Sequence, residues 1–290
     1  MSGRPIARRT RAPLPGRRTR SVRRASAGLS AVRAGAALAM LASAAAIYGV
    51  GASSAFDYAK LQVDGLQFTD PAAVEGALAS VRGRNLFGLT TAPLEATLET
   101  LSTVEKARVD VRLPGTLGVT LEERVPILIW QVGERRYLAD SDGALFALLG
   151  KEPPAGAAGL PLIDDRRAAS AGLSVDRRLD EVDLDAATRL ASLVPADVGS
   201  GAVSLAVVVN DDNGFVLETR PKGWSAVFGF YTPSLRTTDI IPGQVRLLRS
   251  LLVGREQLVD RVTLATETDG TYTPRATPKA KGSAKPSTAP

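Results

Sequence analysis

Two chemically versatile residue types are missing from this chain. Its 290 residues include no cysteine and no histidine. Their absence excludes disulfide bonds, thiol nucleophiles, zinc sites with Cys or His ligands, and the histidine base of the usual hydrolase triad. We therefore expect no cofactor and no metal ion. Without disulfide bonds, the folded part of the chain must be held together by its own apolar core. Roughly 215 residues are enough for two modest domains.

Charged residues are missing from one long stretch. Residues 34–56 read AGAALAMLASAAAIYGVGASSAF and contain no Asp, Glu, Lys or Arg. A helix of this length rises roughly 34 Å, which spans a hydrocarbon core of about 30 Å. We expect an uncleaved transmembrane anchor, because a signal-peptide core is usually only about 7–15 residues long. Two alternatives stay open: a signal peptide cleaved near Ala42-Ser43-Ala44, and a buried alanine-rich helix of a soluble protein.

Acidic residues are missing from the arm before this span, residues 1–33. The arm holds ten arginines: Arg4, Arg8, Arg9, Arg11, Arg17, Arg18, Arg20, Arg23, Arg24 and Arg33. Positive charge beside a span is retained in the cytoplasm, so we expect a single-pass type II protein with its body outside. The segment 57–273 carries 22 basic and 30 acidic side chains, and this balance argues against a nucleic-acid-binding face. The tail, 274–290, is rich in Pro, Ala, Lys and Ser and is expected to be disordered.

The segment 57–125 predicts a small α+β domain. A short strand over 61–66 is followed by a helix that starts at Asp70-Pro71 and by a second helix that starts near Thr91. The apolar period then changes from 3.6 to 2, which predicts two strands joined by a turn at 113–116. We expect the order strand, helix, helix, strand, strand, in an antiparallel sheet with both helices on one face.

The segment 126–273 predicts a mainly antiparallel β domain with flanking helices. The Asn-Gly pair at 213–214 is typical of a tight hairpin. The expected strands lie at 127–132, 136–138, 144–146, 203–209, 215–219, 224–230 and 261–266, and the expected helices at 185–194 and from Pro242 to about 252. The fold class is therefore α+β, with one transmembrane helix in front of two outer domains.

Two acidic clusters could suggest metal binding or catalysis. Asp140 and Asp142 form one, and Asp211 and Asp212 form the other. An Asp-x-Asp-Gly sequence alone lacks the further ligands of a calcium loop, and turn chemistry explains both clusters. We interpret the charges at 122–124 as surface charges at the end of a strand, because no nucleophile pattern accompanies them.

The order of several short motifs resembles the FtsQ/DivIB family. The FtsQ-type polypeptide-transport-associated (POTRA) domain is similar to the runs 63–66 (VDGL), 83–87 (GRNLF), 101–109 (LSTVEKARV), 112–119 (RLPGTLGV) and 123–126 (ERVP). The runs 137–146 (YLADSDGALF) and 160–162 (LPL) resemble the opening of the family's β domain. The resemblance extends from Ala34 to about Tyr272.

The resemblance implies a non-enzymatic scaffold of bacterial cell division. The resemblance further implies that the protein sits in the cytoplasmic membrane at the septum. There it would bind other single-pass proteins, of the FtsB/DivIC and FtsL kinds, through its extracytoplasmic β domain. No small-molecule substrate is expected. Two other functions stay open: an envelope assembly or secretion factor whose POTRA-like domain binds polypeptides, and a secreted hydrolase with Asp/Glu chemistry.

The partner-binding residues are expected in the last predicted strand. Its residues alternate in polarity, and an edge strand offers unpaired backbone groups to an incoming strand. In the resemblance this segment pairs with the FtsB-like partner. The expected contact residues are Arg261, Val262, Thr263, Leu264, Ala265, Thr266 and Tyr272. The alternative is that this strand lies inside the sheet and has no partner.

Overall fold

The computed structural model describes residues 30–276. The chain divides into two compact units, residues 1–52 and 53–290. The expected arginine arm lies outside the described residues up to position 29, and so does the expected disordered tail from position 277.

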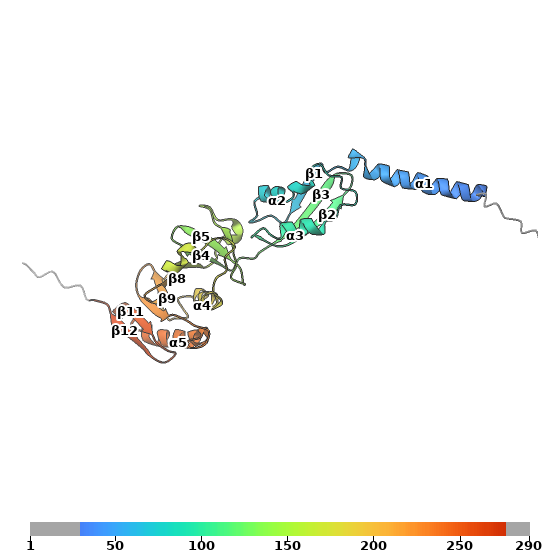
Figure 1. The fold of residues 1–290 in the computed structure, drawn as a ribbon. Helices are drawn as coiled ribbons and strands as arrows, with labels where there is room; N and C mark the ends of the chain where they lie inside the picture. Colours follow the sequence, from blue (N-terminus) through green and yellow to red (C-terminus); the bar gives the residue numbers. More distant parts are fainter. Residues whose placement is uncertain (1–29, 277–290) are drawn as a thin grey trace, which may run out of the picture. The chain divides into compact units, whose positions relative to one another are not determined.

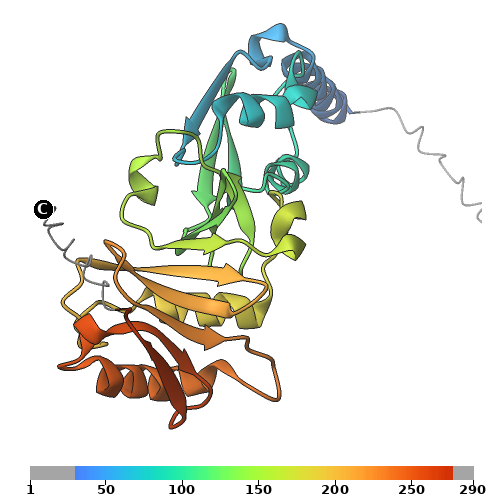
Figure 2. The ribbon, with the colours of Figure 1, turned by 90° about the vertical axis from the view of Figure 1, so that its left-hand side faces the viewer.

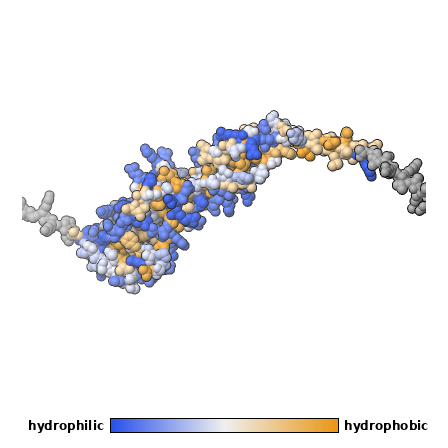
Figure 3. All heavy atoms as spheres, in the orientation of Figure 1, coloured by the Kyte–Doolittle hydropathy of each residue, from blue (hydrophilic) through white to orange (hydrophobic). Residues whose placement is uncertain are grey.

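The first unit contains one long helix, α1 (Ala31–Gly51), which begins where the Ser30 side chain accepts a hydrogen bond from the Arg33 amide. Within the described residues, it is the one helix long and apolar enough to cross a membrane, a property that it shares with signal sequences. Apolar residues dominate its visible surface in Figure 3. The helix ends five residues before the expected end of the span, and Ser54–Phe56 form a short 3₁₀ helix instead.

The second unit begins with the expected small domain, labelled in Figure 1. The order strand, helix, helix, strand, strand is confirmed. The elements are β1 (Lys60–Asp64), α2 (Pro71–Ala77), α3 (Ala92–Leu98), β2 (Val104–Arg112) and β3 (Thr116–Glu123). The side chain of Asp70 caps α2 at the Ala72 amide, as its position before Pro71 predicted.

The three strands of this domain lie in the order β1-β3-β2. β2 and β3 pair antiparallel, but β1 pairs parallel to β3, so the prediction of a fully antiparallel sheet is wrong. The physical reason is the connection: α2, α3 and β2 all lie between β1 and β3 in sequence, which is long enough for the crossover that parallel neighbours need. Residues of both helices and all three strands form one core that includes Leu98, Leu117 and Val119.

The rest of the unit is built on a nine-stranded sheet, with the order β12-β11-β10-β9-β8-β7-β4-β5-β6. Five of its pairings are antiparallel and three parallel, so the sheet is mixed but mainly antiparallel, as predicted. The strands are β4 (Leu128–Val132), β5 (Arg135–Ala139), β6 (Leu145–Leu148), β7 (Leu162–Asp165), β8 (Ser204–Asn210), β9 (Gly214–Arg220), β10 (Ser225–Gly229), β11 (Val259–Leu264) and β12 (Gly270–Pro274).

Two helices, α4 (Glu181–Ala191) and α5 (Ile241–Leu252), share one core with this sheet. α4 begins four residues earlier than predicted, because the Asp180 side chain accepts hydrogen bonds from the first helical amides. Figure 2 shows α5 beside the hairpin β11–β12 at one end of the sheet. Short 3₁₀ helices occur at Ala79–Val81, Ala155–Ala157, Ala168–Gly172, Thr238–Ile240 and Glu256–Leu258.

Glu123 and Arg124 have structural roles that the sequence did not indicate. Glu123 accepts hydrogen bonds at 2.7–2.9 Å from the three consecutive amides of residues 67–69, just before α2. Arg124 forms an ion pair with Asp140 at 2.7 Å and donates to the Ser102 carbonyl. The interpretation of both residues as strand-end surface charges is therefore wrong. Glu123 binds backbone amides before α2, and Arg124 binds the side chain of Asp140 and a backbone carbonyl.

Candidate partner-binding edge

The last strand of the described chain is β12, and it forms one edge of the nine-stranded sheet. β11, where the edge was predicted, lies inside the sheet between β10 and β12. The prediction of an edge at 261–266 is therefore wrong. The reason is that the chain turns at 265–269 and returns as β12, although β12 lacks the alternating apolar pattern that would have indicated a strand.

The predicted contact residues separate into four groups. Val262 and Leu264 are 0% and 1% exposed and belong to the core shared with α4 and α5. Arg261 donates a hydrogen bond to the side chain of Asn213, and Thr263 is exposed. Ala265 and Thr266 lie in the exposed turn after β11. Only Tyr272 lies on the edge strand itself, and its side chain is 49% exposed.

β12 is held in place from both of its ends. At the turn, the Ala265 and Thr266 amides donate to the Asp269 carbonyl, and the Thr266 hydroxyl accepts from the Asp269 amide at 2.9 Å. At the other end, the Arg275 amide donates to the Leu258 carbonyl at 2.7 Å. Between these points β12 pairs with β11 from Gly270 to Pro274. Within residues 30–276, no strand pairs with its outer side.

The opposite edge of the same sheet, β6, is covered at its first residue, Leu145. The Leu145 amide donates to the Arg177 carbonyl at 2.8 Å, and the Asp176 amide donates back to the Leu145 carbonyl at 2.9 Å. An isolated antiparallel bridge joins Ala144 to Arg178. The chain segment 176–178 therefore occupies backbone groups of β6 that an added strand would need, whereas β12 has no such cover in the described chain.

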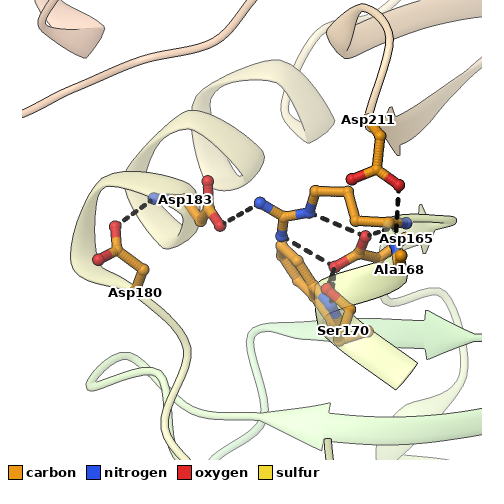
Figure 4. Close-up of polar contacts among 8 residues, drawn as sticks. Asp165, Ala168, Ser170, Asp180, Asp183 and Asp211 are labelled. Carbon is orange, nitrogen blue, oxygen red and sulfur yellow. Dashed lines mark hydrogen bonds and ion pairs between the residues drawn. The ribbon is translucent and has the colours of Figure 1, made fainter. Parts of the chain in front are cut away.

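The sheet also contains a buried ion network, drawn in Figure 4. Asp165 ends β7 and is 1% exposed. Its carboxylate accepts hydrogen bonds from Arg167 at 2.9–3.0 Å, from the Ser170 hydroxyl at 2.6 Å and from the Trp130 indole at 3.1 Å. Arg167 also forms an ion pair with Asp183 of α4 at 2.6 Å. The network ties β4, β7 and α4 together.

Protonation in this network follows from burial and from Arg167. Burial alone would raise the pKa of Asp165, but the hydrogen bonds from Arg167 and Ser170 outweigh it and lower that pKa. Burial raises the pKa of Asp183 more than the charge of Arg167 lowers it. The pKa of Arg167 is raised, because the hydrogen bond with Asp165 and the charge of Asp183 outweigh its own burial. The guanidinium and the Asp165 carboxylate therefore stay charged at neutral pH.

The acidic clusters considered for metal binding serve the backbone. Asp140 accepts hydrogen bonds from the Asp142 and Ala144 amides, which is the expected turn chemistry. Asp211 accepts from the Ala168 amide at 2.8 Å and so holds the segment after β7. The described residues contain no group of three or more acidic side chains placed to hold a metal ion. The buried ion network of Asp165 and Arg167 was not predicted from the sequence. The signal for it was the run Asp164-Asp165-Arg166-Arg167 at the end of a strand.

Comparison with known proteins bears on the small domain of the second unit. A model described as "POTRA domain, FtsQ-type" matches residues 56–124, the segment that contains β1 through β3. Curated proteins named "Cell division protein FtsQ" match the chain as well. The chain thus contains an FtsQ-type POTRA domain and is similar to proteins of the FtsQ/DivIB family. We refer to β1–β3 with α2 and α3 as the POTRA domain, and to the nine-stranded sheet with α4 and α5 as the β domain.

Three FtsQ relatives show how far the similarity reaches. The protein of Mycobacteroides abscessus is 37% identical over 91 residues, which cover 31% of this chain and 28% of the relative. That of Rickettsia bellii is 28% identical over 97 residues, covering 33% and 36%. That of Chloroflexus aurantiacus is 29% identical over 156 residues, covering 53% and 54%. The matched segments thus span less than two thirds of each relative.

Proposed function

We propose that this protein is a non-enzymatic scaffold of the bacterial division machinery, anchored in the cytoplasmic membrane by α1. Its N-terminal arm lies in the cytoplasm, and its POTRA and β domains lie outside and act at the septum. Its partners are single-pass division proteins of the FtsB/DivIC and FtsL kinds. The shared name of its relatives, "Cell division protein FtsQ", supports the cell-division part of this proposal.

The observation that carries the partner-binding proposal is the open outer side of β12. A strand edge offers backbone N–H and C=O groups at regular spacing, and an extended partner segment pairs with them by strand addition. In the β domain, residues 176–178 occupy the backbone groups of Leu145 on the β6 edge, whereas the outer side of β12 is open within the described chain and is the edge we propose for a partner. The half-exposed side chain of Tyr272 adds an aromatic contact with a polar end.

A proline scan of β12 in the full chain tests strand addition. Neighbouring residues of an antiparallel strand point their amides to opposite sides, so Tyr272→Pro and Thr271→Pro affect opposite sides of β12. One of the two removes a hydrogen bond to β11 and the other removes only an outward donor. We expect the variant that lacks the outward donor to keep the stability of the protein and to lose capture of the co-expressed FtsB/DivIC-like partner.

Asp substitutions at Val262 or Leu264 do not serve this test. Both side chains lie in the core, so a buried charge there would unfold the β domain whether or not a partner binds. If both proline variants fold and still capture the partner at wild-type levels, strand addition at β12 is wrong. A fluorescent fusion that spreads evenly over dividing cells instead of marking the septum would contradict the cell-division role.

A further inference from the structure

The POTRA sheet has a long edge of its own. β2 runs over nine residues, Val104–Arg112, and pairs on one side with β3. Within residues 30–276, no strand pairs with its other side. An edge of this length is a template for pairing with another chain unless something covers it. The outer side of β2 is therefore a second place where a strand could add.

Two carboxylates lie along this outer side. The Val109 amide donates to Glu95 Oε1 at 2.9 Å, and the Ala107 amide donates to Glu99 Oε1 at 3.3 Å. Alternate residues of a strand point their amides to the same side, so these are consecutive outward donors in the middle of β2. Both amides already donate to side chains of the same domain, so neither is free to donate to an incoming strand.

The spacing of the two carboxylates matches the spacing of the two amides. Glu95 lies in α3 and Glu99 directly follows it, so the two residues are about 6 Å apart on one side of the helix. Ala107 and Val109 are two strand residues apart, or about 6.6 Å. The buried side chains of Leu94 and Leu98 hold α3 against the core in this register.

We infer that Glu95 and Glu99 close the β2 edge, and that without them β2 pairs with β2 of a second copy of this chain. Antiparallel pairing of two copies centred on Arg108 would set Lys106 of each copy opposite Asp110 of the other. These two pairs of opposite charge flank one pair of like charge, Arg108 opposite Arg108. The closed edge confines strand addition to other parts of the protein. This inference does not depend on a partner at β12.

Residue-resolved hydrogen exchange on the full chain in detergent tests the first half of the inference. In Glu95→Ala/Glu99→Ala, we expect the Ala107 and Val109 amides to exchange about tenfold faster, because each loses its acceptor. The Lys106 and Arg108 amides point toward β3 and should keep their protection. If the exchange of Ala107 and Val109 stays unchanged, or if the whole POTRA domain exchanges faster, the two glutamates do not act as edge covers.

Cysteine cross-linking tests the pairing of two copies. The chain has no cysteine, so Arg108→Cys introduces a single thiol at the centre of the expected β2–β2 pair. We expect several-fold more disulfide-linked dimer when Arg108→Cys is combined with Glu95→Ala/Glu99→Ala than when it stands alone. Glu105→Ala is the matched control, because it removes an exposed carboxylate of the same strand that makes no hydrogen bond in the described chain.

A conservative variant separates capping from charge. The side-chain oxygen of glutamine still accepts a hydrogen bond, so Glu95→Gln/Glu99→Gln should keep the edge closed and the dimer yield low. Equal dimer yields from the double alanine variant and from Glu105→Ala would overturn the inference. So would a glutamine variant that dimerises as strongly as the alanine variant, because the effect would then be a matter of net charge.

Discussion

β2 and β12 are both edge strands, yet their outer sides differ. The outward amides in the middle of β2 donate to Glu95 and Glu99 of the same domain. β12 has no strand on its outer side within residues 30–276 and ends a hairpin at the rim of its sheet. The outward amides of β2 are therefore satisfied inside the chain, whereas we propose that the open groups of β12 bind a partner. The following predictions test that distinction.

The largest effect is expected in the buried ion network. Arg167→Ala leaves the Asp165 carboxylate buried without its charged partner, and a broken buried pair costs about 3–5 kcal/mol of unfolding free energy. Urea denaturation followed by tryptophan fluorescence measures this loss. Arg166→Ala is the matched control, since Arg166 pairs with Asp164 at a more exposed position, and we expect a loss below about 1 kcal/mol there. Equal losses would contradict the assignment.

The same network predicts a pH dependence. The pKa of Asp165 is lowered by folding, so its contribution to stability is present above its unfolded pKa, near 3.8, and is lost as the pH falls further. The pKa of Asp183 is raised by folding. Its contribution to stability is therefore present below its unfolded pKa and is lost as the pH rises through its folded-state pKa. We expect Asp165→Asn to be less stable than the wild type at pH 7, with a difference that shrinks below about pH 4. A difference that stays constant would show that Asp165 does not titrate in this way.

A second stability effect is expected where β11 meets the core. Leu264→Ala removes a fully buried side chain, which costs about 2–5 kcal/mol. Thr263→Ala, one residue earlier on the exposed side of the same strand, should cost less than about 1 kcal/mol. Thermal and urea unfolding of the two variants compare them directly. Similar losses would contradict the placement of β11 inside the sheet with Leu264 facing the core.

Glu123 provides a smaller effect of the same kind. Its carboxylate accepts three amides before α2, so Glu123→Ala leaves several partly buried donors unpaired, at a cost of about 1–3 kcal/mol. Glu122→Ala is the control, because within residues 30–276 the Glu122 side chain makes only a long, exposed ion pair with Lys106. Hydrogen exchange should show faster exchange at residues 67–69 in the Glu123 variant alone. No change at these amides would remove Glu123 from its proposed structural role.

The smallest effect on stability is expected on β12. Tyr272→Ala removes a half-exposed side chain at the sheet edge and should change the unfolding free energy by less than about 1 kcal/mol. If Tyr272 contacts a partner strand, the same change should weaken capture of that partner about tenfold or more, as truncation of a central aromatic residue often does. Full partner binding by Tyr272→Ala would limit the interface to the backbone of β12.

Much of the fold follows from local patterns in the sequence. The period of 3.6 at 74–81 and the period of 2 at 107–111 place the POTRA elements in the right order, because each buries one face. β12 could not be predicted in this way: residues 270–274 are nearly all exposed, and a strand with no buried face has no apolar alternation. This is why the sheet edge was expected one strand too early, at β11.

Polar contacts between segments far apart in the chain could not be predicted from the sequence either. Asp165 meets Trp130 and Ser170 only because β4 and β7 lie side by side in parallel, and parallel pairing depends on crossovers that local patterns do not specify. The hydrogen bonds from β2 amides to Glu95 and Glu99 likewise depend on how α3 packs against the sheet. Tyr272 was predicted as a contact residue and lies on the exposed edge, whereas Val262 and Leu264, predicted with it, face the core.

The central claim is that a partner strand adds to β12 and not to β2. Photo-cross-linking in dividing cells tests it most directly, with the cross-linking residue placed at Tyr272 in one full-length variant and at Arg108 in the other. Both positions lie on sheet-edge strands of the same protein. We predict that the FtsB/DivIC-like partner is captured from position 272 and not from position 108. Capture from position 108 alone, or equally from both, would contradict the account.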